Sequence, residues 1–346
     1  MMDYLTQGGP FHTKHGGGLY VHNNKVSILP PLHPFLAFLV HYSIAISTIF
    51  AVHDNIMMQS HDETTTTTNR VEYDDEATTT TLARRQAHIS TFLFIYTSIL
   101  FTARYLSSYH AGRLRHYSVL YEFNWLCNST LVMSCISYGT WNNTNQYWLF
   151  RRRPLIATSC CVAVSIDQIL WYVDLVVWSI TGRFPFGVIK YLTWKQTLWI
   201  DRFTCTHHLW TIPLLLYGGA NNPITWKSFY LSVYIVTCHV MLSRWLTPHV
   251  IQCYGTTTMT SRITDNNDCS DRGEKGNLGT MDPNYYRYLN VNLSHELWKD
   301  ITIPFLQISK DNPTPFKYFI RLLTRWNLFN ALVFAGILLP LSWVLN

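Results

Sequence analysis

Apolar residues in this chain gather in runs long enough to form helices that cross a lipid bilayer. A spanning helix needs about 20 mostly apolar residues. The expected spans cover residues 34–52, 89–106, 117–138, 154–180, 198–217, 225–246 and 328–345. None of them has the period-2 alternation of a membrane strand. The pattern therefore predicts an all-α, polytopic integral membrane bundle with about seven transmembrane helices.

Polar segments divide the chain between these runs. Residues 1–33 form an N-terminal tail, residues 34–254 hold a six-helix membrane core, and residues 326–346 hold the last span. Residues 60–81 (Thr-rich and acidic) and 255–284 are expected to be disordered, because neither composition can bury enough apolar surface to fold. Residues 285–325 mix apolar and charged side chains, with Leu289, Leu293 and Leu297 at helical spacing. This mixture predicts an amphipathic helix in the membrane interface, or a re-entrant element.

Composition and charge narrow the class of partner. Charged residues make up 13% of the chain, against about a quarter in soluble domains. The net charge of +6 is small, and the basic residues flank apolar runs instead of forming one face. We therefore expect membrane lipids as partners and no nucleic acid. The eight cysteines include no C-x-x-C pair, so neither a zinc ribbon nor a redox motif is indicated.

The distribution of Lys and Arg predicts an orientation. Most basic residues fall in the N-terminal tail and in the second, fourth and sixth loops, which the positive-inside rule makes cytosolic. The run Arg151-Arg152-Arg153 in the third loop disagrees with this majority. The predicted N-terminal tail is cytosolic, and Asn142-Asn143-Thr144 forms a lumenal glycosylation sequon. We expect an endoplasmic reticulum or other endomembrane location.

Several ionisable residues fall within the predicted spans, where a charge costs about 2.5–3.5 kcal/mol on insertion scales. Such residues tend to face the bundle and serve function. His208 (or His207) is the expected catalytic base, with Asp201 as its orienting carboxylate. The predicted orientation brings Glu122, Asp174 and His239 to a similar depth, with Asp167 nearer mid-membrane, and all four are expected to line a substrate site.

Simpler interpretations compete at each of these positions. A lone buried histidine such as His41 most often makes one interhelical hydrogen bond. Glu122 lies near a helix end, where it could snorkel or pair with Arg115. No metal is expected, because the multi-His boxes of membrane di-iron enzymes are absent. His207 and His208 alone are also a poor metal site, since neighbours on a helix point about 100° apart.

Two short stretches resemble a known family. HYSVLYEFNWLCN, which begins at His116, is similar to the H-Y-x-x-x-D-F-x-x-x-x-N stretch of the glycerophosphocholine acyltransferases, with Glu122 one position further along in place of the Asp. IDRFTCTHHLWTIP, which holds Asp201 and His208, resembles that family's I-D-K…H…P stretch. Asp167 before Trp171 is similar to an acidic residue followed by Trp. The resemblance implies a polytopic endoplasmic-reticulum acyltransferase that uses acyl-CoA as co-substrate, and it adds His116 to the substrate site.

The sequence thus favours a membrane-embedded enzyme of lipid metabolism. Acyl transfer from acyl-CoA to a lysolipid or glycerophosphodiester is the leading hypothesis, with no resident cofactor. Basic cytosolic loops would attract an anionic substrate. A proton-coupled carrier could use the same groups as a relay. In a non-catalytic scaffold, these polar residues would only join helices.

Overall fold

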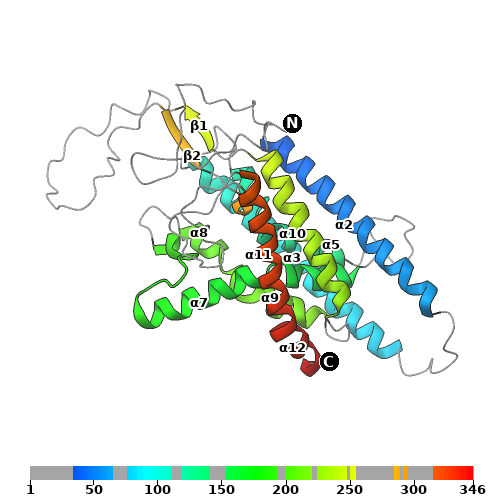
Figure 1. Ribbon diagram of the computed structural model, residues 1–346. Helices are drawn as coiled ribbons and strands as arrows, with labels where there is room; N and C mark the ends of the chain where they lie inside the picture. The colour runs from blue at the N-terminus through cyan, green and yellow to red at the C-terminus, as the bar shows by residue number, and fades with distance from the viewer. Residues whose placement is uncertain are drawn as a thin grey trace, which may run out of the picture.

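The computed structural model describes residues 34–64, 76–110, 119–139, 153–193, 199–219, 224–247, 250–254, 284–288, 291–294 and 315–345. This part of the chain is helical apart from one pair of short strands (Figure 1). The helices are α2 (Pro34–Thr64), α3 (Glu76–His110), α4 (Val119–Glu122), α5 (Leu126–Tyr138), α6 (Pro154–Ala163), α7 (Ser165–Thr181), α8 (Trp199–Thr204), α9 (His207–Gly218), α10 (Trp226–Leu246), α11 (Pro315–Val333) and α12 (Leu339–Leu345). A π-helical turn, Phe334–Leu338, joins α11 to α12.

Four helical stretches in the described chain are long and apolar enough to cross a membrane. They are Phe35–Met58, Thr81–Ser107, Trp226–Leu246 and Phe316–Val344. A fifth is counted if α6 and α7, which meet at a bend of 47°, form one broken span. The remaining two predicted spans are interrupted. Their longer helices, α5 and α9, have 13 and 12 residues, or about 20 Å at 1.5 Å per residue, against a hydrocarbon core of about 30 Å.

The bundle is organised around α10, which packs against α2, α6 and α11. A second group forms where α3 packs against α5, α8 and α9. α7 leaves this body and runs across the direction of α10 and α11 (Figure 1). Large apolar side chains such as Phe94, Ile180 and Val344 are exposed, as expected for helices whose outer faces contact lipid.

Two strands stand at one end of the bundle. β1 (Val250–Tyr254) pairs antiparallel with β2 (Asn284–Tyr288), with Val250 opposite Tyr288. A short 3-10 turn, Val291–Leu293, follows and packs against α10. Its Asn292 side chain accepts from the Leu126 amide at 2.6 Å and donates to the Asn124 carbonyl at 3.0 Å. These bonds satisfy backbone groups at the start of α5.

The structure corrects several predicted boundaries. α2 continues to Thr64 and α3 begins at Glu76, so both ends of the predicted disordered loop are helical. Once a spanning helix is nucleated, each further residue adds a backbone bond at little cost. The amphipathic helix expected from residue 285 is wrong at its start, where β2 lies, and the C-terminal helix begins earlier than predicted, at Pro315. Residues 1–33, 65–75, 255–283 and 295–314 lie outside the described part of the chain.

The dissenting basic residue in the third loop has a structural explanation. Arg153 is 0% exposed, and its Nε and Nη2 atoms each lie 3.1 Å from an Asp54 carboxylate oxygen. The guanidinium also lies 4.6 Å from the centre of the Phe50 ring. Since a buried, paired arginine belongs to the helix packing, it should be left out of the loop charge count used for orientation.

Candidate functional site

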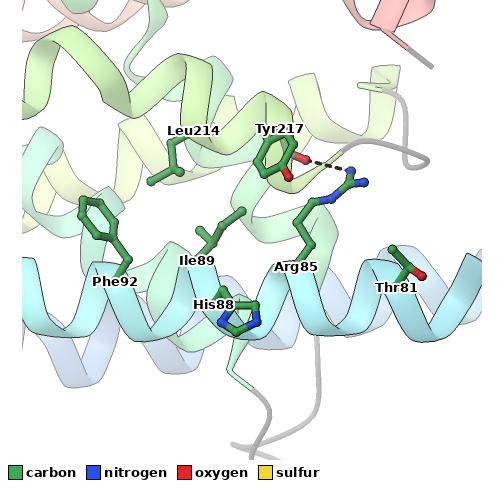
Figure 2. A pocket seen from close by; sticks show the side chains of 7 residues that line it. All are labelled: Thr81, Arg85, His88, Ile89, Phe92, Leu214 and Tyr217. Atoms are coloured by element: carbon green, nitrogen blue, oxygen red, sulfur yellow. Dashed lines mark hydrogen bonds between the residues drawn. The ribbon is translucent and has the colours of Figure 1, made fainter.

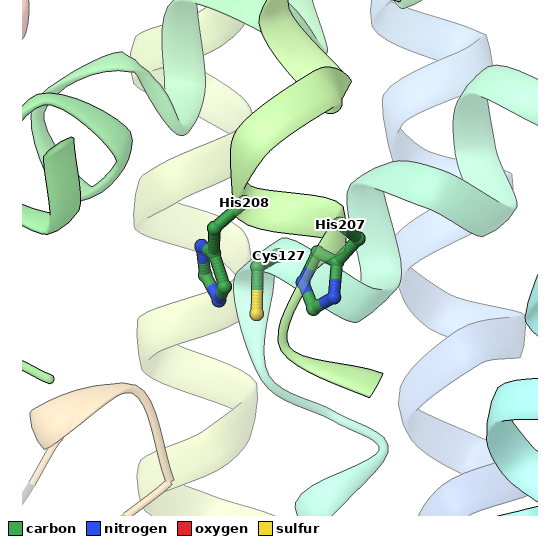
Figure 3. Close-up of side chains that lie close together, drawn as sticks. All are labelled: Cys127, His207 and His208. Carbon is green, nitrogen blue, oxygen red and sulfur yellow. The ribbon is translucent and has the colours of Figure 1, made fainter. Parts of the chain in front are cut away.

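Two adjacent imidazoles form the centre of the candidate site. α8 ends at Thr204 and α9 begins at His207, so the helix is interrupted just before the histidine pair. His207 and His208 are both buried, and their ring centres lie 4.2 Å apart with planes 31° from parallel. Figure 3 shows the Cys127 sulfur of α5 next to both rings. One potential ligand atom from each of the three residues lies within 4.8 Å of the others.

The first turn of α7 forms the surroundings of His208. Gln168 Nε2 lies 2.8 Å from His208 Nδ1, and an Asp167 carboxylate oxygen lies 3.7 Å from the same nitrogen. The Trp171 ring stacks on the imidazole, with centres 5.6 Å apart and planes 13° from parallel. The carboxylate beside His208 is therefore Asp167, whereas the sequence predicted Asp201. The 47° bend at Val164 directs this turn of α7 toward α9.

His207 is held by the backbone of the preceding turn. Its Nδ1 lies 2.6 Å from the Thr204 carbonyl oxygen. Because a carbonyl only accepts, Nδ1 must carry the proton, and Nε2 is left with a free lone pair. That Nε2 atom is buried and has no hydrogen-bond partner among the described residues. Buried polar atoms are rarely left in this state.

A basic centre lies next to the histidine pair. Arg104 of α3 donates to Thr204 Oγ1 at 3.0 Å and to Cys205 Sγ at 3.5 Å. It also interacts electrostatically with Glu122 and Asp201. Two predicted site residues, Glu122 and Asp201, thus interact with the Arg104 guanidinium. The hydrogen-bond acceptors of Arg104 are Thr204 and Cys205, which lie just before His207 in the chain.

The loop after α7 closes this region from one side. The Tyr191 hydroxyl lies 2.9 Å from Cys205 Sγ. Burial raises the pKa of Tyr191 well above its ordinary value of 10.0, and the neighbouring Cys205 thiol adds to the rise. The hydroxyl therefore stays protonated at any physiological pH and serves as a polar, uncharged contact.

Two of the predicted substrate residues, His239 and Asp174, are not part of this cluster. His239 Nδ1 lies 2.8 Å from His41 Nε2 on α2, which confirms the single interhelical hydrogen bond expected for His41. Asp174 accepts from the backbone amides of Phe186 at 2.8 Å and Ile189 at 3.3 Å. Its charge is used to hold the loop after α7. His116 lies outside the described residues.

A groove runs beside α9, toward the end opposite the imidazoles. It has a volume of about 460 Å³ and is lined by Thr81, Arg85, His88, Ile89, Phe92, Leu214 and Tyr217. Figure 2 shows the Arg85 guanidinium over the Tyr217 ring, where it also donates to the Tyr217 carbonyl. The floor of the groove is apolar and Arg85 stands at the end far from the imidazoles, so the groove has the chemistry of a site for an apolar chain.

Sequence reasoning missed several members of the cluster. The sequence singles out neither Cys127 nor Arg104, because an isolated Cys in an apolar run and an Arg near a helix end carry no specific signal. Gln168 had one available signal, because it is a second polar residue beside Asp167 in an apolar run.

Comparison with family models, with curated proteins and with solved structures finds no match for this chain. The function of the cluster must therefore be argued from its own chemistry. That chemistry consists of two imidazole rings, one carboxylate, one thiol and one nearby arginine, which come from α9, α7, α5 and α3.

Proposed function

We propose that this chain is a membrane-embedded enzyme of lipid metabolism, which transfers an acyl group from acyl-CoA to a lysolipid or glycerophosphodiester acceptor. The observation that carries the proposal is the buried His208 beside the Asp167 carboxylate, 3.7 Å away. Buried ionisable groups are expensive in a membrane protein and tend to serve function. A His–carboxylate pair is the usual unit for moving a proton between oxygen and a leaving group.

The pair would act at two points of the reaction. In the first, it takes the proton from the acceptor hydroxyl as that oxygen attacks the thioester carbonyl. In the second, it returns a proton to the departing thiolate of coenzyme A. The carboxylate stabilises the charged form of the ring between these steps. Arg104, next to the histidine pair, would favour the anionic groups of the donor.

The resemblance to the acyltransferase family gains support from how the chain folds. Two of its stretches are distant in sequence, and their matched residues include Asp167 with Trp171 in one and His208 in the other. In the structure these side chains belong to one cluster. Residues that carry a family's chemistry are expected to meet in this way, whereas chance matches are not.

Contacts along α3 support seven crossings. The Glu122 end of α4–α5 interacts with Arg104, and Cys135 further along α5 accepts from Ser90 at 2.7 Å. α9 likewise begins beside Arg104 and ends where Gln86 donates to the Gly218 carbonyl at 3.2 Å. Arg104 and Gln86 are about 27 Å apart along a helix. We propose that α4–α5 and α8–α9 each cross as one interrupted span, with the histidine cluster facing the cytosol in an endomembrane.

We propose that the acyl chain binds in the groove between α3 and α9. His208 and Leu214 are about 9 Å apart along α9, a distance that the first several carbons of an extended chain can cover. Apolar contacts in the groove would stabilise the chain without fixing its length.

The decisive experiment is an acyl-transfer assay on the purified full chain in lipid. Labelled acyl-CoA would be supplied with lysophosphatidylcholine or with glycerophosphocholine, and the labelled lipid product would be measured. We expect product from the wild type, a loss of at least a hundredfold in His208→Gln, and near-normal turnover in the matched variant His239→Gln. Absence of product from the wild type with either acceptor would overturn the proposal, and uptake driven by a pH gradient would then favour the carrier hypothesis.

A further inference from the structure

We propose that Cys127, His207 and His208 bind one zinc ion at the centre of the cluster. The thiol and the two imidazoles come from α5 and α9, and one potential ligand atom from each lies within 4.8 Å of the other two (Figure 3). Sulfur and imidazole nitrogen are the donors that zinc prefers, and a set of one Cys with two His is more typical of zinc than of magnesium or calcium.

The hydrogen bonds around the rings leave the correct atoms available. Metal-binding histidines almost always donate their other ring N–H to a carbonyl, a carboxylate or water. His207 does this through Nδ1 to the Thr204 carbonyl oxygen at 2.6 Å. Its Nε2 is buried without a partner among the described residues, and a metal ion would supply the missing contact.

The neighbours of the His208 ring can also hold a proton on Nδ1 and leave Nε2 available. Gln168 Nε2 faces His208 Nδ1 at 2.8 Å, while the Oε1 atom of the same amide is buried and without a partner in the described chain. A half-turn of this amide would let Oε1 accept from Nδ1–H. The Asp167 carboxylate stands on the same side of the ring, at 3.7 Å. Both partners would fix the proton on Nδ1 and leave Nε2 as the ligand.

His207 and His208 alone are a poor metal site because adjacent helix residues point about 100° apart, but Cys127 supplies a third ligand. Two neighbouring helix residues cannot enclose an ion alone, but here they begin a helix, their rings are only 4.2 Å apart, and the sulfur of another helix stands beside both. Zinc bonds of about 2.0–2.3 Å place two nitrogens and one sulfur about 3.3–3.6 Å apart in a tetrahedral site. The three atoms would therefore close by up to about 1.5 Å on binding, which side-chain rotations permit. The thiol proton is released as the metal–sulfur bond forms.

Three protein ligands leave the fourth zinc position open, which is typical of catalytic zinc. This inference deepens the proposed function and in that respect rests on it: a thioester carbonyl at the open position would be polarised by the ion. His208 Nε2 would then be a ligand, so proton transfer would fall to Asp167, the other member of the pair.

Metal binding is tested first without any activity measurement. The full chain, purified in detergent without chelator, would be analysed for metal content, and the metal-free protein would be titrated with Co²⁺ as a spectroscopic probe. We expect about one zinc per chain and a thiolate-to-cobalt charge-transfer band. Cys127→Ser should remove that band, and His207→Gln should reduce the bound metal at least tenfold. The matched variants Cys135→Ser and His41→Gln should keep both.

A second measurement on the wild type covers the case in which a variant fails to fold. Alkylation of Cys127 would be followed by peptide mass spectrometry with zinc present and after chelation. Protection by zinc supports the site, since a ligated thiolate is shielded. Substoichiometric metal in the wild type, a cobalt band that survives in Cys127→Ser, or equal alkylation with and without zinc would each overturn it.

The two proposals can fail separately. One zinc per chain with no acyl transfer to any acceptor keeps the metal site and removes the proposed reaction. Acyl transfer that is undiminished after complete zinc removal keeps the reaction and removes the metal from it.

Discussion

His208 of α9 and Asp167 of α7 face each other across 3.7 Å in the interior of the described bundle. The contact depends on two interruptions in helices: the bend of 47° between α6 and α7, and the break between α8 and α9. Straight helices would carry both residues past each other. The site therefore depends on the irregular parts of the fold, which hydropathy alone does not predict.

Asp167→Asn should reduce acyl transfer by about 10²- to 10⁴-fold, the usual contribution of one acid–base group. The amide keeps the size of the side chain but cannot hold a proton or stabilise a charged ring. Combined with His208→Gln, the loss should be much less than the product of the two single losses, because the residues act as a unit. Turnover would be measured beside His239→Gln as the control, and fully multiplicative losses would contradict the pairing.

Arg153→Met should destabilise the bundle by about 3 kcal/mol, because it leaves the Asp54 carboxylate without its bidentate partner. Asp54→Asn with Arg153→Met should recover part of this loss, since no uncompensated charge is left. Thermal unfolding in detergent would rank the stability of the wild type, Arg153→Met and the double variant. If the double variant is no more stable than Arg153→Met, the ion pair is not the source of the effect.

Gly218→Ala should destabilise the packing of α9 against α3 and α5. A Cβ atom at this glycine would lie 2.8 Å from Ile89 Cδ1 and 2.9 Å from Tyr138 Cε2, closer than packed atoms allow. Overpacking of this kind costs about 1–3 kcal/mol. Gly336→Ala is the matched control, because a Cβ there meets nothing within 4 Å. Similar melting temperatures for the two variants would contradict the close approach.

Some features of this protein could be predicted from the chain and others could not. Long apolar runs are a one-dimensional signal, so the helical membrane class and the ends of α10 were predictable. Spacing and loop charge also predict one membrane depth for Glu122, Asp201 and the histidine pair, and that depth stays a prediction; in the structure Glu122 and Asp201 both interact electrostatically with Arg104. The partner of each polar group was not predictable, because Asp174 and His239 occupy the same kind of apolar run as Asp167 yet bond to a loop and to another histidine. Only the angular position of each helix separates these outcomes.

The contact between Asp54 and Arg153 also predicts the topology of the third loop. Asp54 lies near the C-terminal end of the first span, Phe35–Met58, and the chain then returns through α3 to Arg104 and His110. In the proposed topology α4–α5 is a span between residues 110 and 153, which would bring Arg153 back to the Asp54 end of α2. With the N-terminal tail in the cytosol, Asn142 is then lumenal.

We therefore expect endomembrane-expressed protein to carry a glycan that a glycosidase removes and that Asn142→Gln abolishes. An acceptor sequon introduced between Gly182 and Pro185, in the loop after α7, should stay unmodified because the proposed topology places that loop in the cytosol. This second protein controls for the accessibility of the glycosylation enzymes, since its native Asn142 remains modified. A glycan on the introduced sequon would show that the loop after α7 is lumenal, and so would contradict the proposed orientation. An unmodified Asn142, together with cleavage of residues 140–152 by protease added outside sealed vesicles whose cytosolic face is outward, would instead reduce the count by one span and leave the buried Asp54–Arg153 pair incompatible with the bilayer. The glycosylation experiment thus tests the Asp54–Arg153 contact and the interrupted span α4–α5 together, because the proposed topology needs both.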